Sequence, residues 1–299
     1  MKNRAIIILV ATMSLILVHC SSKNKSSGNA NVDASTEVPG TIIEESTSQS
    51  QRTVKRASQQ PNPAPVTAIA NTQRSSTPSS NAYGALNQHI KNQDEESILK
   101  EGSSLLMKNP NDTKAINAMA MSYYKRGQYP LAKNLLLRAL KIDGSAYEVH
   151  SNLGVVQLAV GEKNEALKSF KKAIELNPND YVSASNAGSL YVVEQDFDKA
   201  SVVLEIAYSK GYRNTKVLSN YAIALTATGK YDKADKIYRE ALKENSNNKE
   251  VLFNHAILLI HFLKRNEEGL EIVKKLKFLG VPEEGRRRLQ ELEKIAEKK

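Results

Sequence analysis

The chain has 299 residues, enough for two ordinary domains, but its composition is so uneven that only the part after about residue 82 is expected to fold. Its formal net charge is +10, and basic residues are scattered among acidic ones. Nucleic-acid binding needs basic residues gathered on one face with stacking aromatics, so this distribution argues against it.

Residues 1–19 are predicted to be an export signal. Lys2 and Arg4 precede an apolar run from Ala5 to Val18, whose fourteen residues are too few to span a bilayer comfortably. A transmembrane helix takes about 20 residues. Cys20 follows this run and is the only cysteine in the chain, so it cannot form an internal disulfide.

Leu17 to Cys20 resemble the lipobox of bacterial lipoproteins, although His19 stands where that family has a small residue. The resemblance implies that Cys20 becomes the acylated first residue of the mature chain. Ser21 then implies transfer to the outer membrane, facing the periplasm. A soluble secreted protein and a chain held by an uncleaved leader are the alternatives.

Residues 20–82 are predicted to form the lipidated N-terminus and a disordered tether. The segment is rich in Ser, Thr, Asn, Gln and Pro and has neither helical nor strand periodicity. It cannot bury enough apolar surface to offset its chain entropy. As a flexible coil of roughly 60 residues, it would reach about 45 Å on average.

After residue 82, alanines recur at a step of 34 residues. Two sets keep this step, seven residues apart: Ala132, Ala166, Ala200 and Ala234, then Ala139, Ala173, Ala207 and Ala241. Such a period predicts a stack of helix pairs. Clear repeats are expected at Thr113–Ala146, Tyr147–Asp180, Tyr181–Asn214 and Thr215–Asn248, with weaker ones at Ser79–Asp112 and Lys249–Pro282. In the last repeat Gly269 replaces the alanine one residue late, which predicts a loop longer by one residue.

Each clear repeat resembles the tetratricopeptide repeat. The likeness is carried by the sequences NLG at Asn152–Gly154 and NAG at Asn186–Gly188, and by the turn glycines Gly127, Gly161 and Gly229. It implies an all-α, right-handed solenoid of about five to six helix pairs over residues 83–282. Residues 283–299 are expected to form a charged capping helix, with Leu289, Leu292 and Ala296 on one side.

The small residues that recur in each repeat have a packing reason within this fold. Residues Ala120, Gly154, Gly188 and Ala222 would let the first helix of a pair approach the second closely. Large side chains of the second helix, such as Phe170, Leu204 and Tyr238, would then fill the gaps.

The sequence predicts no enzyme. The five histidines include no pair at a metal-ligand spacing on one helix face, and there is no phosphate-binding loop, dinucleotide fingerprint or zinc-peptidase motif. We therefore expect no catalytic residue, metal, cofactor or small-molecule substrate.

A second ladder of side chains suggests where a partner binds. Asn152, Asn186, Asn220 and Asn254 also repeat every 34 residues, on the first helices that line the concave face of a tetratricopeptide superhelix. A carboxamide offers donors and an acceptor that match a peptide bond, and the ladder resembles one by which some tetratricopeptide proteins hold extended peptides. The alternative is that each Asn bonds within its own solenoid. Further groove candidates at this helical phase are Val155, Ser189, Val192, Ile223 and Ile257.

These features favour a scaffold that binds an extended or helical protein segment and attaches to the membrane through its N-terminal lipid. The order of lipobox, tether and repeats resembles envelope lipoproteins that serve motility, pilus secretins or peptidoglycan enzymes. The segments Asn254–Leu259 and Gly269–Pro282 look most like tetratricopeptide lipoproteins of the adventurous gliding machinery. A pilotin-like assembly factor for an outer-membrane secretin and a regulator of peptidoglycan enzymes remain alternatives.

Overall fold

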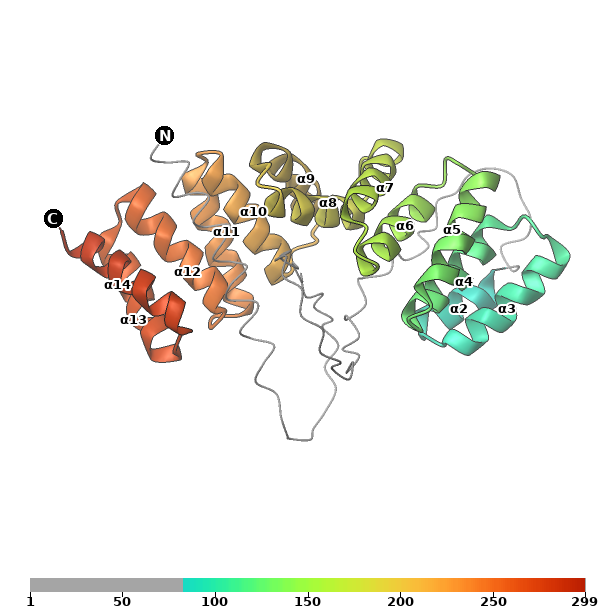
Figure 1. The fold of residues 1–299 in the computed structure, drawn as a ribbon, viewed down its shortest axis with the longest axis horizontal. Helices are drawn as coiled ribbons and strands as arrows, with labels where there is room; N and C mark the ends of the chain where they lie inside the picture. The colour runs from blue at the N-terminus through green and yellow to red at the C-terminus, as the bar shows by residue number, and fades with distance from the viewer. Residues whose placement is uncertain (1–82, 299) are drawn as a thin grey trace, which may run out of the picture. The chain divides into compact units, whose positions relative to one another are not determined.

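The structure, a computed structural model, describes residues 83–298 apart from the side chain of Glu284. Cys20, the export signal and the tether lie outside the described residues. Within them the chain forms thirteen α-helices, one π-helix and no strand (Figure 1), which confirms the predicted all-α class. The helices are α2 (Gly84–Lys91), α3 (Glu95–Lys108), α4 (Thr113–Lys125), α5 (Tyr129–Ile142), α6 (Tyr147–Ala159), α7 (Lys163–Leu176), α8 (Tyr181–Val193), α9 (Phe197–Ser209), α10 (Thr215–Ala227), α11 (Tyr231–Glu244), α12 (Lys249–Ile257), the π-helix η1 (Leu258–Leu263), α13 (Asn266–Leu279) and α14 (Glu283–Glu297).

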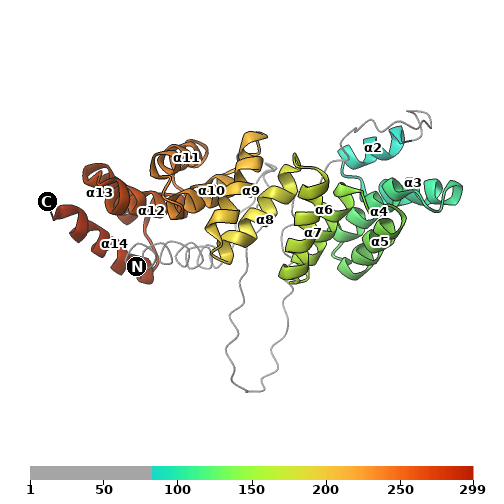
Figure 2. The ribbon, with the colours of Figure 1, turned by 90° about the horizontal axis from the view of Figure 1, so that it is seen from above.

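The described residues fall into two compact units, an N-terminal unit of residues 83–186 and a C-terminal unit of residues 187–298. Within each unit, consecutive helices pack as hairpins that both views show side by side (Figures 1 and 2): α4 with α5 and α6 with α7 in the first, α10 with α11 and α12 with α13 in the second. A first helix of 13 residues and a second of 14 recur in the pairs α4/α5, α6/α7 and α10/α11. This regularity produces the 34-residue step.

Local side-chain chemistry fixes where the helices begin and turn. The carboxylate of Asp112 accepts a hydrogen bond from the backbone N–H of Ala115 at 3.0 Å and so caps the N-terminus of α4. Asp94, Asp196, Asn214 and Asn248 cap α3, α9, α10 and α12 in the same way. The turn inside a pair needs a positive φ, which the predicted glycines supply, as at Gly161 with 82°. Gln93, Gln195 and Lys264 adopt this conformation in the three turns within described pairs that lack a glycine.

Close packing within a pair depends on a small residue of the first helix. A Cβ atom at Gly154 would lie 2.6 Å from Cε1 of the fully buried Phe170 on α7. In the C-terminal unit, a Cβ at Gly188 would lie 2.4 Å from Cγ of Leu204. Both contacts are shorter than van der Waals separation, so a side chain at either place would force Phe170 or Leu204 to move. The packing predicted from the sequence is confirmed.

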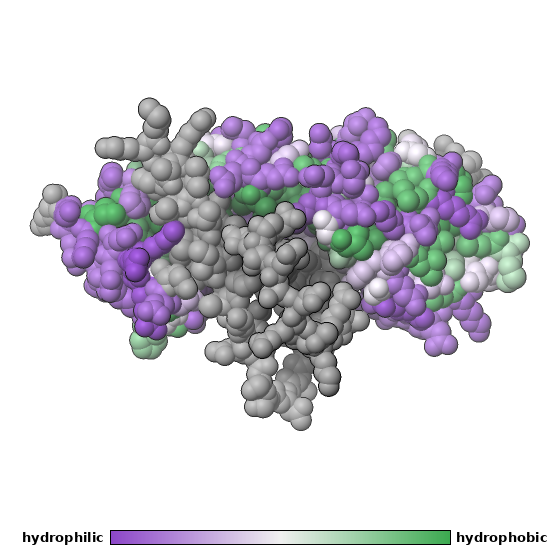
Figure 3. Space-filling view, viewed as in Figure 1, coloured by the Kyte–Doolittle hydropathy of each residue, from purple (hydrophilic) through white to green (hydrophobic). Residues whose placement is uncertain are grey.

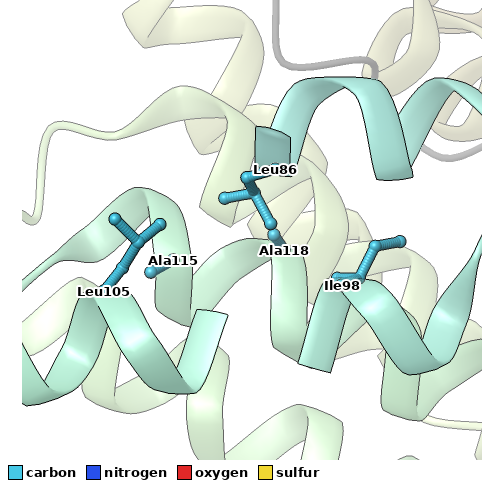
Figure 4. Close-up of a cluster of buried hydrophobic side chains, with 5 residues drawn as sticks. All are labelled: Leu86, Ile98, Leu105, Ala115 and Ala118. Carbon is cyan, nitrogen blue, oxygen red and sulfur yellow. The ribbon is translucent and has the colours of Figure 1, made fainter. Parts of the chain in front are cut away.

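The first pair, α2 and α3, reverses this arrangement. Leu86 stands where Gly154 stands two periods later, and Gly102 stands where Phe170 does. Leu86 is fully buried in a cluster with Ile98, Leu105, Ala115 and Ala118 (Figure 4). The space at Gly102 is taken by Met119 of the next pair, because a Cβ there would lie 2.5 Å from the Met119 Cγ. The large and small residues have exchanged helices.

The last pair, formed by α12 with η1 and by α13, differs from the prediction of a longer loop. The extra residue before Gly269 was expected to lengthen a loop, but it lies within the helix, where α12 continues into the π-helix Leu258–Leu263. A π-turn holds one more residue than an α-turn at similar length. After this insertion Ile260 faces the partner helix, and a Cβ at Gly269 would lie 2.4 Å from its Cγ1. The register shift therefore explains both the late position and the glycine.

The C-terminal helix α14 covers the last pair. It extends over Glu283–Glu297 and packs against α13. Leu289, Leu292 and Ala296 are buried, as expected for its apolar side. The Asn266 Nδ2 donates to the Ala296 backbone oxygen at 3.0 Å, which ties the start of α13 to the end of α14.

Candidate partner-binding site

The four asparagines of the predicted ladder lie in two kinds of environment. Asn152 in the N-terminal unit and Asn254 in the C-terminal unit are buried, with 0% and 1% of their surface exposed. Asn186 and Asn220 are half-buried. Only the second pair is accessible to a ligand without movement of neighbouring side chains.

In the N-terminal unit, Asn152 joins two consecutive first helices. Its Nδ2 donates to Oδ1 of Asn117 on α4 at 2.9 Å. Sequence reasoning missed Asn117, because the 34-residue alignment places Ala118 at this position and Asn117 precedes it by one. A search that allowed a step of 35 would have found it. Asn186 instead donates from Nδ2 to the Val182 backbone oxygen of its own helix at 3.0 Å.

In the C-terminal unit, the structure brings together two of the predicted site residues. The Asn220 Nδ2 donates to the Ser189 Oγ at 2.9 Å, linking α10 to α8. A carboxamide has two N–H donors and a carbonyl acceptor. Among the contacts of the described residues, Asn186 and Asn220 each use one donor, so a second donor and the oxygen could bind a peptide group.

The predicted apolar groove residues are buried. Val155 lies in the core of the N-terminal unit, and Val192, Ile223 and Ile257 lie in that of the C-terminal unit. They contribute to packing between helices, and a partner could reach them only if side chains moved. The accessible polar candidates are therefore Asn186 in one unit and Ser189 with Asn220 in the other. A role for them in partner contact stays a prediction.

A charge cluster around the buried residues Asp235 and His255 of the C-terminal unit was not foreseen from the sequence. The Asp235 carboxylate on α11 bonds to His255 Nε2 at 2.6 Å and accepts from the Arg265 Nη1 at 2.7 Å and the Arg239 Nε at 3.1 Å. Both arginines also pair with Glu268 at 2.6 Å. These residues come from α11, α12 and the start of α13. Helical spacing connects Asp235 with Arg239 and Arg265 with Glu268, but it does not connect one helix with the next.

Burial and pairing together set the charges in this cluster. Burial lowers the pKa of His255 and outweighs its pairing with Asp235, which acts in the opposite direction. Burial would raise the pKa of Asp235, but hydrogen bonds from His255, Arg265 and Arg239 hold it below its usual value. The His255 Nδ1 is buried without a hydrogen-bond partner among the described residues. With His255 neutral, the two positive charges of the arginines are balanced by the negative charges of Asp235 and Glu268.

The described residues contain no group of three or more His, Cys, Asp or Glu side chains arranged to hold a metal ion. No helix in the part of the chain that the structure describes is long and apolar enough to cross a membrane.

Comparison with known families identifies the repeats. Models described as tetratricopeptide repeat match residues 113–142, 147–180 and 215–248. These three segments are recognised as tetratricopeptide repeats. The matched segments coincide with the pairs α4/α5, α6/α7 and α10/α11, three of the four clear repeats expected from the alanine step.

One known tetratricopeptide repeat protein is similar in sequence to part of the chain, and solved structures are similar to it in fold. Human tetratricopeptide repeat protein 6 is 36% identical over 92 residues, which are 31% of this chain and 18% of that protein, so the chain spans less than a fifth of its length. The crystal structure of YrrB, described as a tetratricopeptide protein with an unusual peptide-binding site, superposes with a TM-score of 0.55 at 17% identity, covering 60% of this chain and 91% of that one. A MamA mutant superposes with a TM-score of 0.51 at 24% identity, covering 56% and 97%. At these identities the structural likeness shows the fold.

Proposed function

We propose that the protein is a non-enzymatic scaffold of the bacterial envelope that holds an extended or helical segment of a partner protein. The tetratricopeptide fold supports the general role, since it is a fold of protein–protein interaction scaffolds. The lipobox-like Leu17 to Cys20 motif supports attachment to the outer membrane on its periplasmic side. The resemblance to gliding-motility lipoproteins favours a motility or other envelope machine.

The observation that carries this proposal is the accessible amide chemistry on the first helices. Asn186 and Asn220 are half-buried on α8 and α10, and each has hydrogen-bonding capacity beyond its single contact. Carboxamides bind peptide groups whatever the side chains are, which suits recognition of an extended chain. Apolar side chains of the partner would be accommodated by local rearrangement of the core residues beneath.

The test is partner capture by the natively anchored protein. A photo-crosslinking residue at position 189 should capture a partner, and Asn186→Ala with Asn220→Ala should abolish that capture without a change in helicity. A matched control is Asn87→Ala with Asn164→Ala, since both asparagines are exposed on other helices. Capture that is undiminished in the first variant, or equally reduced in the control, would contradict the assignment.

The anchor is tested separately. Cys20→Ala should release the protein from the membrane fraction, because the variant lacks the thiol that would carry the lipid. Retention of this variant on membranes would contradict lipid attachment through Cys20 and leave the scaffold role untouched.

A pilotin-like role differs in what loss of the protein does to its machine. A scaffold's deletion should leave an outer-membrane ring in place and disconnect its neighbours, whereas a pilotin's deletion should displace the ring. Fluorescence localisation of the ring in a deletion strain separates the two.

A further inference from the structure

Two positions on the outer face of α5 differ from the equivalent positions of the other second helices. Leu131 and Leu137 stand there and are 41% and 39% exposed. The corresponding residues of the other second helices are all polar: Ser97 and Ser103, Glu165 and Lys171, Lys199 and Glu205, Lys233 and Arg239, and Glu268 and Lys274. Since five related helices have polar residues at these two positions, the repeat fold does not require leucine there.

The surroundings of these leucines are apolar and cationic. Ile142, at the end of α5, is also 38% exposed, and hydrophobic residues gather on the surface where α3, α4 and α5 lie (Figure 3). A shallow, open depression on α5 lies beside Leu137 and is lined by Asn134, Arg138, Leu140 and Lys141 as well. The helix contains no acidic residue, so Arg138 and Lys141 give its outer face a positive charge.

The chain itself contains a segment of the opposite character. Between residues 21 and 82 there are four acidic residues, Asp33, Glu37, Glu44 and Glu45, and no basic residue lies between positions 26 and 51. The adjacent residues Ile42 and Ile43 are apolar. Residues 32–46 are thus both acidic and apolar, within a segment whose remaining charges are all basic.

We propose that the outer face of α5 is a docking surface for residues 32–46 of the same chain, with Ile42 and Ile43 against the leucines and Glu44 and Glu45 paired with Arg138 and Lys141. The charges are complementary, and the exposed leucines offer apolar surface to the two isoleucines. Docking of this segment would shorten the tether, and its release would extend it.

Chain length permits this contact. Glu45 is separated from Tyr83 by 38 positions, for which a flexible coil has an average reach of about 34 Å. A coil of this length would create an effective concentration on the order of millimolar. An affinity too weak to detect between separate molecules is therefore sufficient within one chain.

Photo-crosslinking in the full chain tests the proposal. A photo-crosslinking residue at position 134, which keeps both leucines, should form an intramolecular crosslink to residues 32–46, located by mass spectrometry. The matched control carries it at Lys168, the same position on α7, and should not label that segment. Glu44→Lys with Glu45→Lys should reduce the crosslink at least 5-fold.

Charge exchange provides the decisive control. Adding Arg138→Glu and Lys141→Glu to the glutamate variant should restore at least half of the crosslink, because the pairing is rebuilt with reversed signs. Leu131→Glu with Leu137→Lys, which installs the residues found on α7, should remove it while the circular dichroism spectrum is unchanged. A crosslink to another segment or between two molecules, or one that ignores the charge changes, would overturn the proposal.

Discussion

The glycine at position 154 offers the most direct test of how the helix pairs are held together. In Gly154→Ala the new Cβ would lie 2.6, 2.7 and 2.9 Å from three carbons of the Phe170 ring. This ring is fully buried, so it can yield only by displacing its own neighbours. Alanine should therefore destabilise the fold at a place where helix propensity alone favours it.

The two opposing effects can be weighed. Overpacking a well-packed core costs about 1 to 3 kcal/mol. Replacing glycine by alanine inside a helix gains about 1 kcal/mol. Since all three contacts are shorter than 3.0 Å and involve an aromatic ring, we place the packing cost near the top of its range and expect a net loss of about 1 to 2 kcal/mol. For a protein of this size that corresponds to a fall in Tm of about 2 to 8 °C.

Thermal and urea unfolding followed by circular dichroism would measure this change. Gly144→Ala is the matched control, because its nearest atom would be the Leu140 oxygen at an ordinary 3.5 Å and stability should be unchanged or slightly higher. Combining Gly154→Ala with Phe170→Leu recreates the pair that Ala120 and Leu136 form in the preceding repeat. The double variant should be more stable than the sum of the two single changes predicts. A single Gly154→Ala variant as stable as the parent would refute the packing argument.

Two further predictions concern buried polar groups. Asn152→Ala should lower the free energy of unfolding by about 1 to 3 kcal/mol, because it leaves the buried Asn117 oxygen without its donor. Asn186→Ala, measured by urea unfolding in the same experiment, should lower it far less. Equal losses in the two variants would contradict this difference. Acidification should destabilise the C-terminal unit, because the fold lowers the pKa of His255. The contribution of His255 to stability is complete above its unfolded pKa of about 6.5. It decreases as the pH falls below that value, by at most about 1.4 kcal/mol per pH unit. The pKa of Asp235 is also lowered and adds a loss of the same sign at still lower pH. His255→Leu should flatten the Tm profile between pH 7 and pH 5, and an unchanged profile would refute the assignment.

The sequence predicted the regular part of the fold because that part depends on residue size at a fixed spacing. The alanine step located the helix pairs, and the small residue at Gly154 indicated its close contact with Phe170, which the structure confirms. Spacing alone could not decide where the additional residue before Gly269 lies. A loop and a π-turn both lengthen the interval by one, and the choice depends on whether Ile260 can fill the space that the glycine leaves.

The candidate site was less predictable, because the 34-residue step shows which residues are equivalent but not how deeply they lie. Asn152 and Asn220 are equivalent in the alignment, yet the first is enclosed beside Asn117 and the second is half-exposed beside Ser189. Whether the asparagine is enclosed or exposed depends on the side chain beside it, and that side chain belongs to another repeat. The cluster around Asp235 was missed for the same reason, since its members meet only when three helices pack together.

Departures from the repeat pattern can be sorted by whether the fold compensates for them. Leu86 and Gly102 depart from the pattern together. Leu86 fills space in the core of the first pair, and Gly102 leaves the space that Met119 occupies. The leucines of α5 are instead 41% and 39% exposed, at positions where the related helices have polar residues. A compensated departure needs no explanation beyond packing. An uncompensated one on the surface costs solubility without improving the core, and this difference directs the search for a binding surface to α5.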